Sequence, residues 1–171
     1  MGRILDLPEE LVSNVASKLG CDDKCALRLT CRTLDERSFH EFGTEHFSEK
    51  GVHFNTDSLK TLVDISHSRL SKYVKEVSIV IALFSEQGFS CPGRETAHWR
   101  PSVRQSEAYK FYIQDQATLR STGNDKKMLI EAFKSLPSLK VVEFVDTETA
   151  LKPSVDYRGA RKVARQTGKY N

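Results

Sequence analysis

Three cysteines and one histidine near the N-terminus are the side chains best suited to metal chemistry. Cys21, Cys25, Cys31 and His40 offer the sulfur and nitrogen ligands that zinc prefers. Structural zinc sites favour closely spaced cysteine pairs, and only the spacing of Cys21 and Cys25 fits that pattern. Cys25 and Cys31 also fall on the apolar face of a predicted helix. We therefore interpret these thiols as packing residues and expect no metal ion and no cofactor.

A cysteine and a histidine in the middle of the chain raise a second chemistry, that of a thiol nucleophile. Cys91 and His98 lie near each other in the sequence, but no third residue that would orient the histidine is apparent. The adjacent carboxylates Glu9 and Glu10 stand at the start of a predicted helix, where the helix dipole explains them. The glycines are isolated, so no phosphate-binding loop is present. We expect a chain without catalytic residues, and therefore not an enzyme.

The charge of the chain is concentrated at its C-terminus. The 171 residues carry 26 basic and 23 acidic side chains, a net charge of +3. Residues 152–171 alone hold six basic residues and one acid, or +5, so the other 151 residues carry −2. A basic tail of this kind can contact nucleic acid or an acidic partner, which is our alternative function. The simpler interpretation is a solvated helix or a frayed end, so we do not expect nucleic acid to be the main partner.

Composition and length restrict the environment and the size of the fold. The chain is 39% hydrophobic, which is compatible with one domain or two small modules and argues against disorder. Its longest apolar stretch, Val77 to Phe84, is far shorter than the roughly 20 residues of a membrane span. The first residues reach an acid and a proline too early for a secretory signal, and the four cysteines do not resemble a disulfide framework. We expect a cytoplasmic or nuclear protein with reduced thiols and no membrane partner.

The first 47 residues are predicted to form three short helices. Asp6 stands in a capping position before Pro8, and an apolar stripe at helical spacing follows until Gly20. Asp22 or Asp23 is predicted to cap a second helix, and a third begins at about residue 33. A core built from three helices of this size is marginal by itself. This region therefore requires a partner or the rest of the chain.

A pattern of helix, short link and strand occurs twice in the remainder. Residues 129–133 align with 62–66, and residues 139–145 align with the β-branched run 74–80. Two such units with parallel strands resemble irregular leucine-rich repeats, although a coincidental pair of α/β units stays open as an alternative. The insertion between them, 84–125, is predicted to be a loop up to Pro101 and then a helix over 103–120, with Asp125 capping the next helix.

The N-terminal pattern resembles an F-box. The string from Leu7 to Leu11, the helical stripe and a Cys-Arg close occur in one ungapped register. Residues 26–32, 58–74 and 136–140 are similar to F-box proteins of filamentous fungi, in which a degenerate leucine-rich-repeat-like region follows the F-box. The resulting prediction is an α+β fold: a three-helix F-box at 1–47, a leucine-rich-repeat-like region with parallel strands at 48–151, and a basic tail at 152–171.

The resemblance implies a non-catalytic subunit of an SCF-type ubiquitin ligase. Such a subunit docks a Skp-family adaptor, which leads to the cullin and RING subunits, and presents a protein client with its C-terminal region. Trp99, in the predicted loop, is a weak candidate for client binding. The residues expected to contact the adaptor are Leu7, Pro8, Glu9, Leu11, Val12, Val15, Leu19, Leu27, Cys31 and Arg32.

The sequence departs from the family pattern at four positions. Lys24 and Cys25 stand where the family often has two apolar residues. Thr30 replaces a common valine, and Leu34 occupies a position where tryptophan is frequent. Substitutions of this kind are expected to weaken adaptor binding without preventing it, because Cys25 and Leu34 are still apolar.

Overall fold

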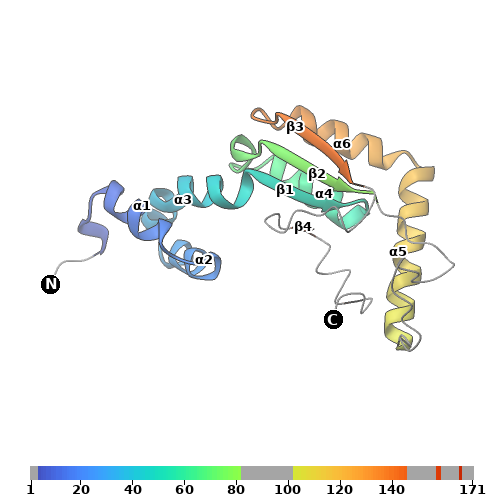
Figure 1. Cartoon of the computed structure of the whole chain (residues 1–171), viewed down its shortest axis with the longest axis horizontal. Coiled ribbons are helices and arrows are strands. Elements are labelled where there is room, and N and C mark those ends of the chain that lie inside the picture. Colours follow the sequence, from blue (N-terminus) through green and yellow to red (C-terminus); the bar gives the residue numbers. More distant parts are fainter. Residues whose placement is uncertain (1–3, 82–101, 146–156, 159–165, 167–171) are drawn as a thin grey trace. The chain divides into compact units, whose positions relative to one another are not determined.

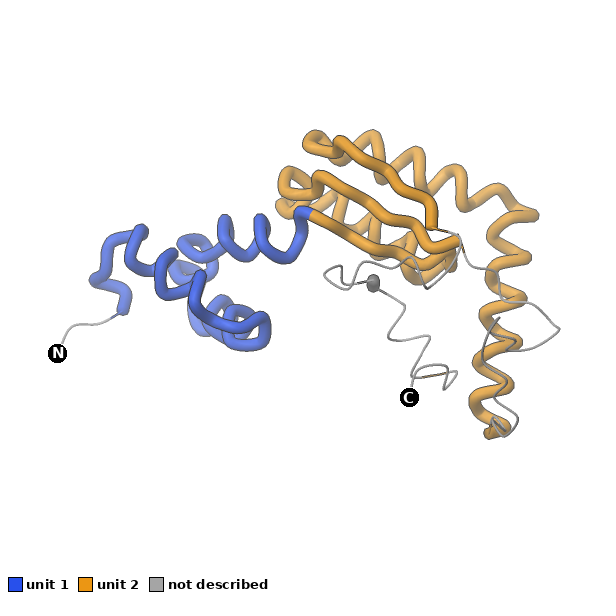
Figure 2. The backbone as a smooth tube through the Cα atoms, viewed as in Figure 1, with its two compact units in different colours: residues 1–48 blue, residues 49–171 orange. Residues whose placement is uncertain are grey.

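The structure, a computed structural model, describes residues 4–81, 102–145, 157–158 and 166. The chain divides into two compact units, which Figure 2 colours separately: unit 1 is Met1–Ser48 and unit 2 is Glu49–Asn171. Unit 1 is helical, and unit 2 combines helices with a parallel sheet. The predicted α+β class with an N-terminal helical module is confirmed. Cys91, His98, Trp99 and most of the basic tail lie outside the described residues.

Unit 1 contains a short 3-10 turn and three helices (Figure 1). They are η1 (Ile4–Asp6), α1 (Glu9–Ser17), α2 (Cys21–Thr30) and α3 (Arg32–Phe47). The predicted caps are wrong, because Asp6 ends η1 while Pro8 and Gly20 are the N-cap residues of α1 and α2. Pro8 can occupy the N-cap because its φ of −55° suits the start of a helix. Its carbonyl oxygen accepts hydrogen bonds from the amides of Leu11 and Val12 at 3.1 and 3.2 Å.

The interior of unit 1 is built by one stripe of α1 and the aromatic side of α3. Val12 and Ala16 are each 1% exposed and lie one helical turn apart on α1. Both α1 and α2 pack against α3. The buried apolar side chains of α3 are Leu34, Phe39, Phe42 and Phe47. The core of unit 1 is therefore centred on α3, the longest of its helices.

Unit 2 is organised around a parallel sheet with strand order β3-β2-β1-β4. Its strands are β1 (Glu49–His53), β2 (Glu76–Val80), β3 (Val141–Val145) and β4 (Tyr157–Arg158). Its helical elements are α4 (Thr56–Ser66), η2 (Ser71–Tyr73), α5 (Val103–Ser121) and α6 (Asn124–Lys134). Leu59 and Leu62 of α4 and Val77 and Ile79 of β2 are at most 1% exposed, so aliphatic packing forms the centre of this unit.

The strand register reproduces the internal repeat seen in the sequence. β3 pairs with β2 so that Val142 lies beside Val77 and Phe144 beside Ile79, which are the pairs that the repeat alignment aligns. The helices that precede these strands, α4 and α6, pack side by side (Figure 1). The His67 Nε2 atom lies 2.9 Å from the Glu131 carboxylate and links the two helices. The two repeat units are therefore stacked next to each other in the fold.

The predicted helix of the insertion is present, and its start is strongly specified. Ser102 and Gln105 form a capping box at the beginning of α5, in which each side chain bonds the other residue's backbone amide. α5 and α6 meet at Gly123, which has a left-handed φ of 65° and is the N-cap of α6. Asp125 was predicted to cap α6, but it lies inside the first turn. In the described part of the chain, no helix is long and apolar enough to cross a membrane.

Candidate functional site

The outward face of α1 exposes large apolar side chains. Leu11 and Val15 are 48% and 44% exposed and lie one turn apart, so they form a single stripe. The neighbouring stripe, Val12 and Ala16, is buried against the rest of unit 1. The helix thus satisfies its own packing with one stripe and leaves a second apolar stripe in contact with solvent.

Three further apolar side chains of unit 1 are exposed outside α1. Ile4 and Leu5 in η1 are 41% and 43% exposed, and Leu29 in α2 is 86% exposed. Among the described residues, Leu29 is the most exposed large apolar side chain. Large apolar side chains that a small unit leaves exposed are the ones that another protein can contact. We call these five residues the unit 1 apolar surface: Ile4, Leu5, Leu11, Val15 and Leu29.

The predicted adaptor-binding residues fall into three groups by exposure. The exposed ones are Pro8, Glu9, Leu11, Val15 and Arg32. The half-buried ones are Leu7, Leu19, Leu27 and Cys31. Val12 differs from the prediction, since it is 1% exposed and packs inside unit 1. The physical reason is helical geometry, because one residue turns the helix by about 100° and carries position 12 away from the stripe of Leu11.

Three residues of the unit 1 apolar surface were absent from the prediction: Ile4, Leu5 and Leu29. A signal for Leu29 exists in the sequence. Leu27 and Leu29 are two residues apart, about 200° around a helix, so they cannot both face the same core. Ile4 and Leu5 precede the first helix, where helical spacing gives no information about burial.

Arg37 of α3 fixes the segment that leads into α1. Its Nη1 atom donates hydrogen bonds to the carbonyl oxygens of Leu5 at 3.2 Å and Leu7 at 2.8 Å. Both acceptors lie just before Pro8, so the guanidinium orients the entrance to the helix. Arg37 therefore positions part of the unit 1 apolar surface without belonging to it.

Two cationic side chains of α2, Lys24 and Arg28, bond to acidic side chains of α3. Lys24 is 2% exposed, and its ammonium donates to the carboxylate of Glu45. That hydrogen bond is the main reason why the pKa of Glu45 lies below its usual value; burial opposes it, and the charges of Lys24 and His46 reinforce it. Arg28 bonds Asp35 at 2.7 Å, and its guanidinium lies 3.8 Å from the ring centre of Phe42.

The four departures from the family pattern take different places in this arrangement. Lys24 and Leu34 are buried, Cys25 is half-buried and Thr30 is exposed. The hydroxyl of Thr30 donates to the carbonyl of Leu27 at 2.6 Å. Lys24 is therefore an internal residue that joins two helices. Its position does not place a charge on the unit 1 apolar surface.

None of the three cysteines of unit 1 takes part in a disulfide among the described residues. Cys21 is exposed, while Cys25 and Cys31 are half-buried. Among the residues that the structure describes, no cluster of three or more histidine, cysteine or acidic side chains is arranged to hold a metal ion. The zinc alternative raised by Cys21, Cys25, Cys31 and His40 therefore has no supporting geometry in this region.

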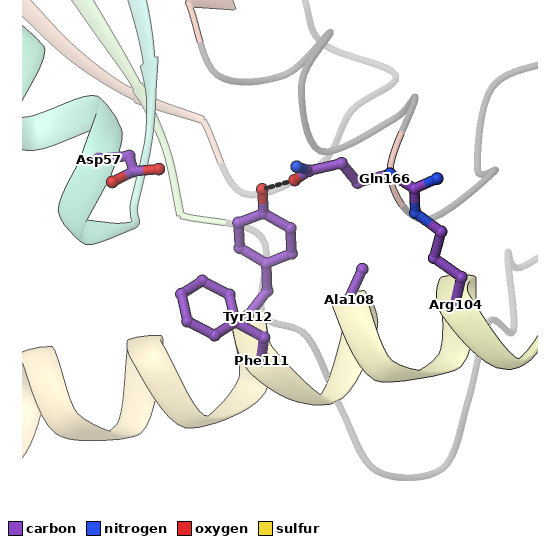
Figure 3. Close-up of a pocket in the computed structure, with 6 residues that line it drawn as sticks. All are labelled: Asp57, Arg104, Ala108, Phe111, Tyr112 and Gln166. Carbon is purple, nitrogen blue, oxygen red and sulfur yellow. Dashed lines mark hydrogen bonds between the residues drawn. The ribbon is translucent and has the colours of Figure 1, made fainter.

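Unit 2 contains a pocket of about 350 Å³ beside α5 (Figure 3). Its lining is Asp57, Arg104, Ala108, Phe111, Tyr112 and Gln166. The hydroxyl of Tyr112 points to the amide oxygen of Gln166, 2.5 Å away. Asp57 and Arg104 carry opposite charges, and the described residues of the wall include no nucleophile–base pair.

The comparison with protein families identifies the class of unit 1. Residues 4–34 match the F-box domain, so the match spans η1, α1 and α2 and ends at the start of α3. All five residues of the unit 1 apolar surface lie within it. The match supports an F-box protein, and F-box proteins are generally non-catalytic substrate receptors.

F-box domains bind Skp-family adaptors within SCF complexes, and they imply involvement in substrate recognition by ubiquitin ligases. Neither the curated proteins nor the solved structures contain a match to this chain. The wider resemblance to filamentous-fungal proteins stays a prediction.

Proposed function

We propose that this chain recruits clients to an SCF-type ubiquitin ligase, with unit 1 docking a Skp-family adaptor that leads to the cullin and RING subunits. The observation that carries the proposal is the coincidence of the F-box match with the unit 1 apolar surface. An apolar helix face that the chain itself leaves uncovered suits insertion into a groove on another protein.

The proposed contact residues combine the sequence prediction with the exposure found in the structure. They are Ile4, Leu5, Leu7, Pro8, Glu9, Leu11, Val15, Leu19, Leu27, Leu29, Cys31 and Arg32. Burying a large apolar side chain contributes about 1.5–3 kcal/mol before the costs of association. Leu11, Val15 and Leu29 together are therefore sufficient to dominate the affinity. We assign Val12 to the interior of unit 1, where it supports the stripe from behind.

We propose that unit 2 is a short leucine-rich-repeat-like body that presents the client. Two features support this proposal: consecutive parallel strands β1, β2 and β3, and a register that follows the internal repeat. In repeat proteins, stacked units of this kind create extended binding surfaces. Unit 2 would then hold the client while unit 1 holds the ligase.

The test is binding of the full chain to a purified Skp-family adaptor. Replacing both Leu11 and Val15 by Asp puts two charges into the proposed interface, and we expect at least a roughly 100-fold loss of affinity. Asn14→Asp is the matched control, since Asn14 is an exposed residue of the same helix and its substitution adds one of the two charges outside the proposed interface. It is expected to change the affinity by less than about 3-fold.

Circular dichroism separates loss of docking from loss of fold. Because Leu11 and Val15 are nearly half exposed, the double variant is expected to keep its helical signal. Adaptor binding that survives in the folded double variant would show that α1 is not the docking helix, and the proposed function would then be wrong.

A further inference from the structure

Among the described strands of unit 2, the one at the end of the sheet pairs on one side only. In the described sheet, β3 is at the end of the order and pairs only with β2 (Figure 1). An edge strand presents backbone N–H and C=O groups that can form hydrogen bonds with another chain. The question is which groups of β3 face outward and what kind of segment they suit.

The hydrogen bonds to the neighbouring segment identify the outward residues. Val145 accepts a bond from the Ile81 amide at 2.8 Å, and Val141 donates to the Lys75 carbonyl at 3.2 Å. In a strand, the N–H and C=O of one residue point to the same side, and this side alternates along the chain. Val141 and Val145 therefore face β2, while the backbone groups of Val142 and Phe144 face away from it.

The side chains of the outward residues are also accessible. Val142 is 37% exposed and Phe144 is 59% exposed, although both are large and apolar. Val141–Val145 contains neither proline nor lysine, two residues that often protect a sheet edge, and its one charged side chain is Glu143. The edge thus offers two amides, two carbonyls and two apolar side chains to one additional strand.

Charge decides which partner fits this edge. Glu143, between the two outward residues, is half-buried, and its carboxylate accepts a bond from the Ser78 hydroxyl at 3.3 Å. If a second copy of β3 paired antiparallel about the strand centre, Glu143 would lie opposite Glu143. Like charges directly opposite each other destabilise a strand pair, whereas opposite charges stabilise it. The edge therefore favours a segment with a basic residue at this position.

We propose that the outer edge of β3 binds an extended segment of a protein partner as a fifth strand, with a lysine or arginine opposite Glu143 and an apolar residue on each side of it. The apolar residues would lie against Val142 and Phe144. The proposal deepens the function proposed above, because such a segment would be the recognition element of the client. Strand addition of this kind obtains affinity from backbone hydrogen bonds and specificity from alternate side chains.

The experiment uses the full chain and fluorescein-labelled synthetic peptides, with binding followed by fluorescence anisotropy. The first peptide has a central lysine between two valines, flanked by threonine and serine. The second has glutamate in place of the lysine, and the third carries N-methyl groups on alternate amides. We expect the lysine peptide to bind at least roughly 5-fold more tightly than the glutamate peptide. The N-methylated peptide is expected not to bind, because it lacks the donors of the strand.

Two variants of the chain assign binding to the edge. Glu143→Lys is expected to reverse the preference, so that the glutamate peptide becomes the tighter ligand. Val142→Pro removes an outward amide and keeps the bonds to β2, so it should abolish binding while leaving the folded state intact. Ile130→Ala is the matched control, because Ile130 is an apolar residue with 54% exposure that belongs to α6 and not to β3.

Several results would overturn the proposal. One is equal binding of the N-methylated peptide, or unchanged binding to a folded Val142→Pro variant. Another is a dimer of the wild-type chain that Val142→Pro dissociates, which would assign the edge to a second copy. A third is binding that appears only after removal of residues 146–171, since the edge would then be covered by the chain itself. The double Asp variant at positions 11 and 15 should bind the peptide normally, so failure of adaptor docking is distinguishable from failure at β3.

Discussion

Units 1 and 2 both expose apolar side chains, but they do so on different types of backbone. In unit 1, Leu11 and Val15 project from a helix whose backbone groups bond within the helix, so a partner can contact only side chains. In unit 2, Val142 and Phe144 belong to the end strand of the described sheet, and their backbone groups face away from β2. Unit 1 therefore requires a partner with a preformed apolar groove, whereas unit 2 suits an extended segment.

The interiors of the two units differ as well. The α2–α3 contact of unit 1 contains the pair formed by the buried Lys24 and the half-exposed Glu45, and the Arg28–Asp35 pair. Unit 2 packs aliphatic side chains such as Leu62 and Val77 at its centre, and it also buries the side chains of Lys50 and His53. The α2–α3 contact should thus make unit 1 sensitive to charge and pH, while space filling should dominate around Leu62 in unit 2.

The largest expected effect tests whether the units are energetically separate. Leu62→Ala leaves a cavity under the sheet and should lower the free energy of unfolding of unit 2 by about 2–5 kcal/mol. Urea titration combined with residue-resolved hydrogen exchange measures this loss. Exchange protection in α3 is expected to stay unchanged. Equal loss of protection in both units would contradict the separation, and Leu29→Ala, at an 86% exposed position, is the control.

The next largest effect is expected when either partner of the Lys24–Glu45 ion pair is removed. Glu45→Ala leaves the Lys24 ammonium buried without its partner and should cost unit 1 about 1–3 kcal/mol of unfolding free energy. This estimate is below that for a fully buried pair because Glu45 is 50% exposed. Lys24→Met replaces the charge by an apolar chain of similar length and should change stability by less than about 1 kcal/mol. Urea titration of both variants checks the asymmetry, and equal losses would contradict it.

The same pair predicts the pH dependence of unit 1. Because the pKa of Glu45 is lowered in the folded state, its stabilising contribution is present above its usual value of 4.5. The contribution is lost as the pH falls through the lowered value. As the pH is lowered, the stability of the wild type should therefore fall more steeply than that of the Glu45→Gln variant. Acid titration followed by circular dichroism measures both curves. Parallel acid curves for the two proteins would show that Glu45 is not responsible.

A smaller effect is expected at the entrance to α1. Arg37→Ala removes both bonds to the carbonyls of Leu5 and Leu7 while leaving the apolar contact residues in place. We expect adaptor affinity to fall about 3- to 10-fold, because each charge-assisted bond contributes about 1.5–3 kcal/mol before relaxation. Isothermal titration calorimetry provides the measurement. Arg37→Lys keeps a single donor group and should lose less adaptor affinity. A loss equal to that of Arg37→Ala would contradict the positioning role.

The smallest effect is expected at the link between α4 and α6. His67 and Glu131 are 53% and 54% exposed, and exposed pairs contribute little. Glu131→Gln should change the unfolding free energy of unit 2 by less than about 1 kcal/mol, measured by urea titration. A loss as large as that of Leu62→Ala would show that this pair, rather than aliphatic packing, holds the two repeats together.

The periodic features of the molecule could be predicted from the sequence because they depend on spacing. The repeat alignment identified the β2–β3 register, since a shift of one residue would turn Val77 and Ile79 to the other face of the sheet. The helix over 103–120 followed from apolar spacing, and α5 covers Val103–Ser121.

Features that depend on contacts between different helices could not be predicted from spacing in the sequence. The sequence contains no sign that Lys24 would be buried, because its partner Glu45 lies on another helix. Val12 and Leu11 have similar side chains, and only the position of α3 decides which of them is internal. Gly123 replaced Asp125 as the cap of α6 because a left-handed backbone, not a side-chain acceptor, connects the two helices.

The joint at Gly123 has a mechanical consequence. A Cβ atom added there would meet nothing within 4 Å, so any residue has room, and the φ of 65° is the sole obstacle. An L-residue in that conformation costs about 1–2 kcal/mol, and the neighbouring sequence on both sides is already helical. A single substitution at this position would therefore strain the joint by about that amount, while the buried side chains of Gln116 and Leu119 resist any change in the direction of α5.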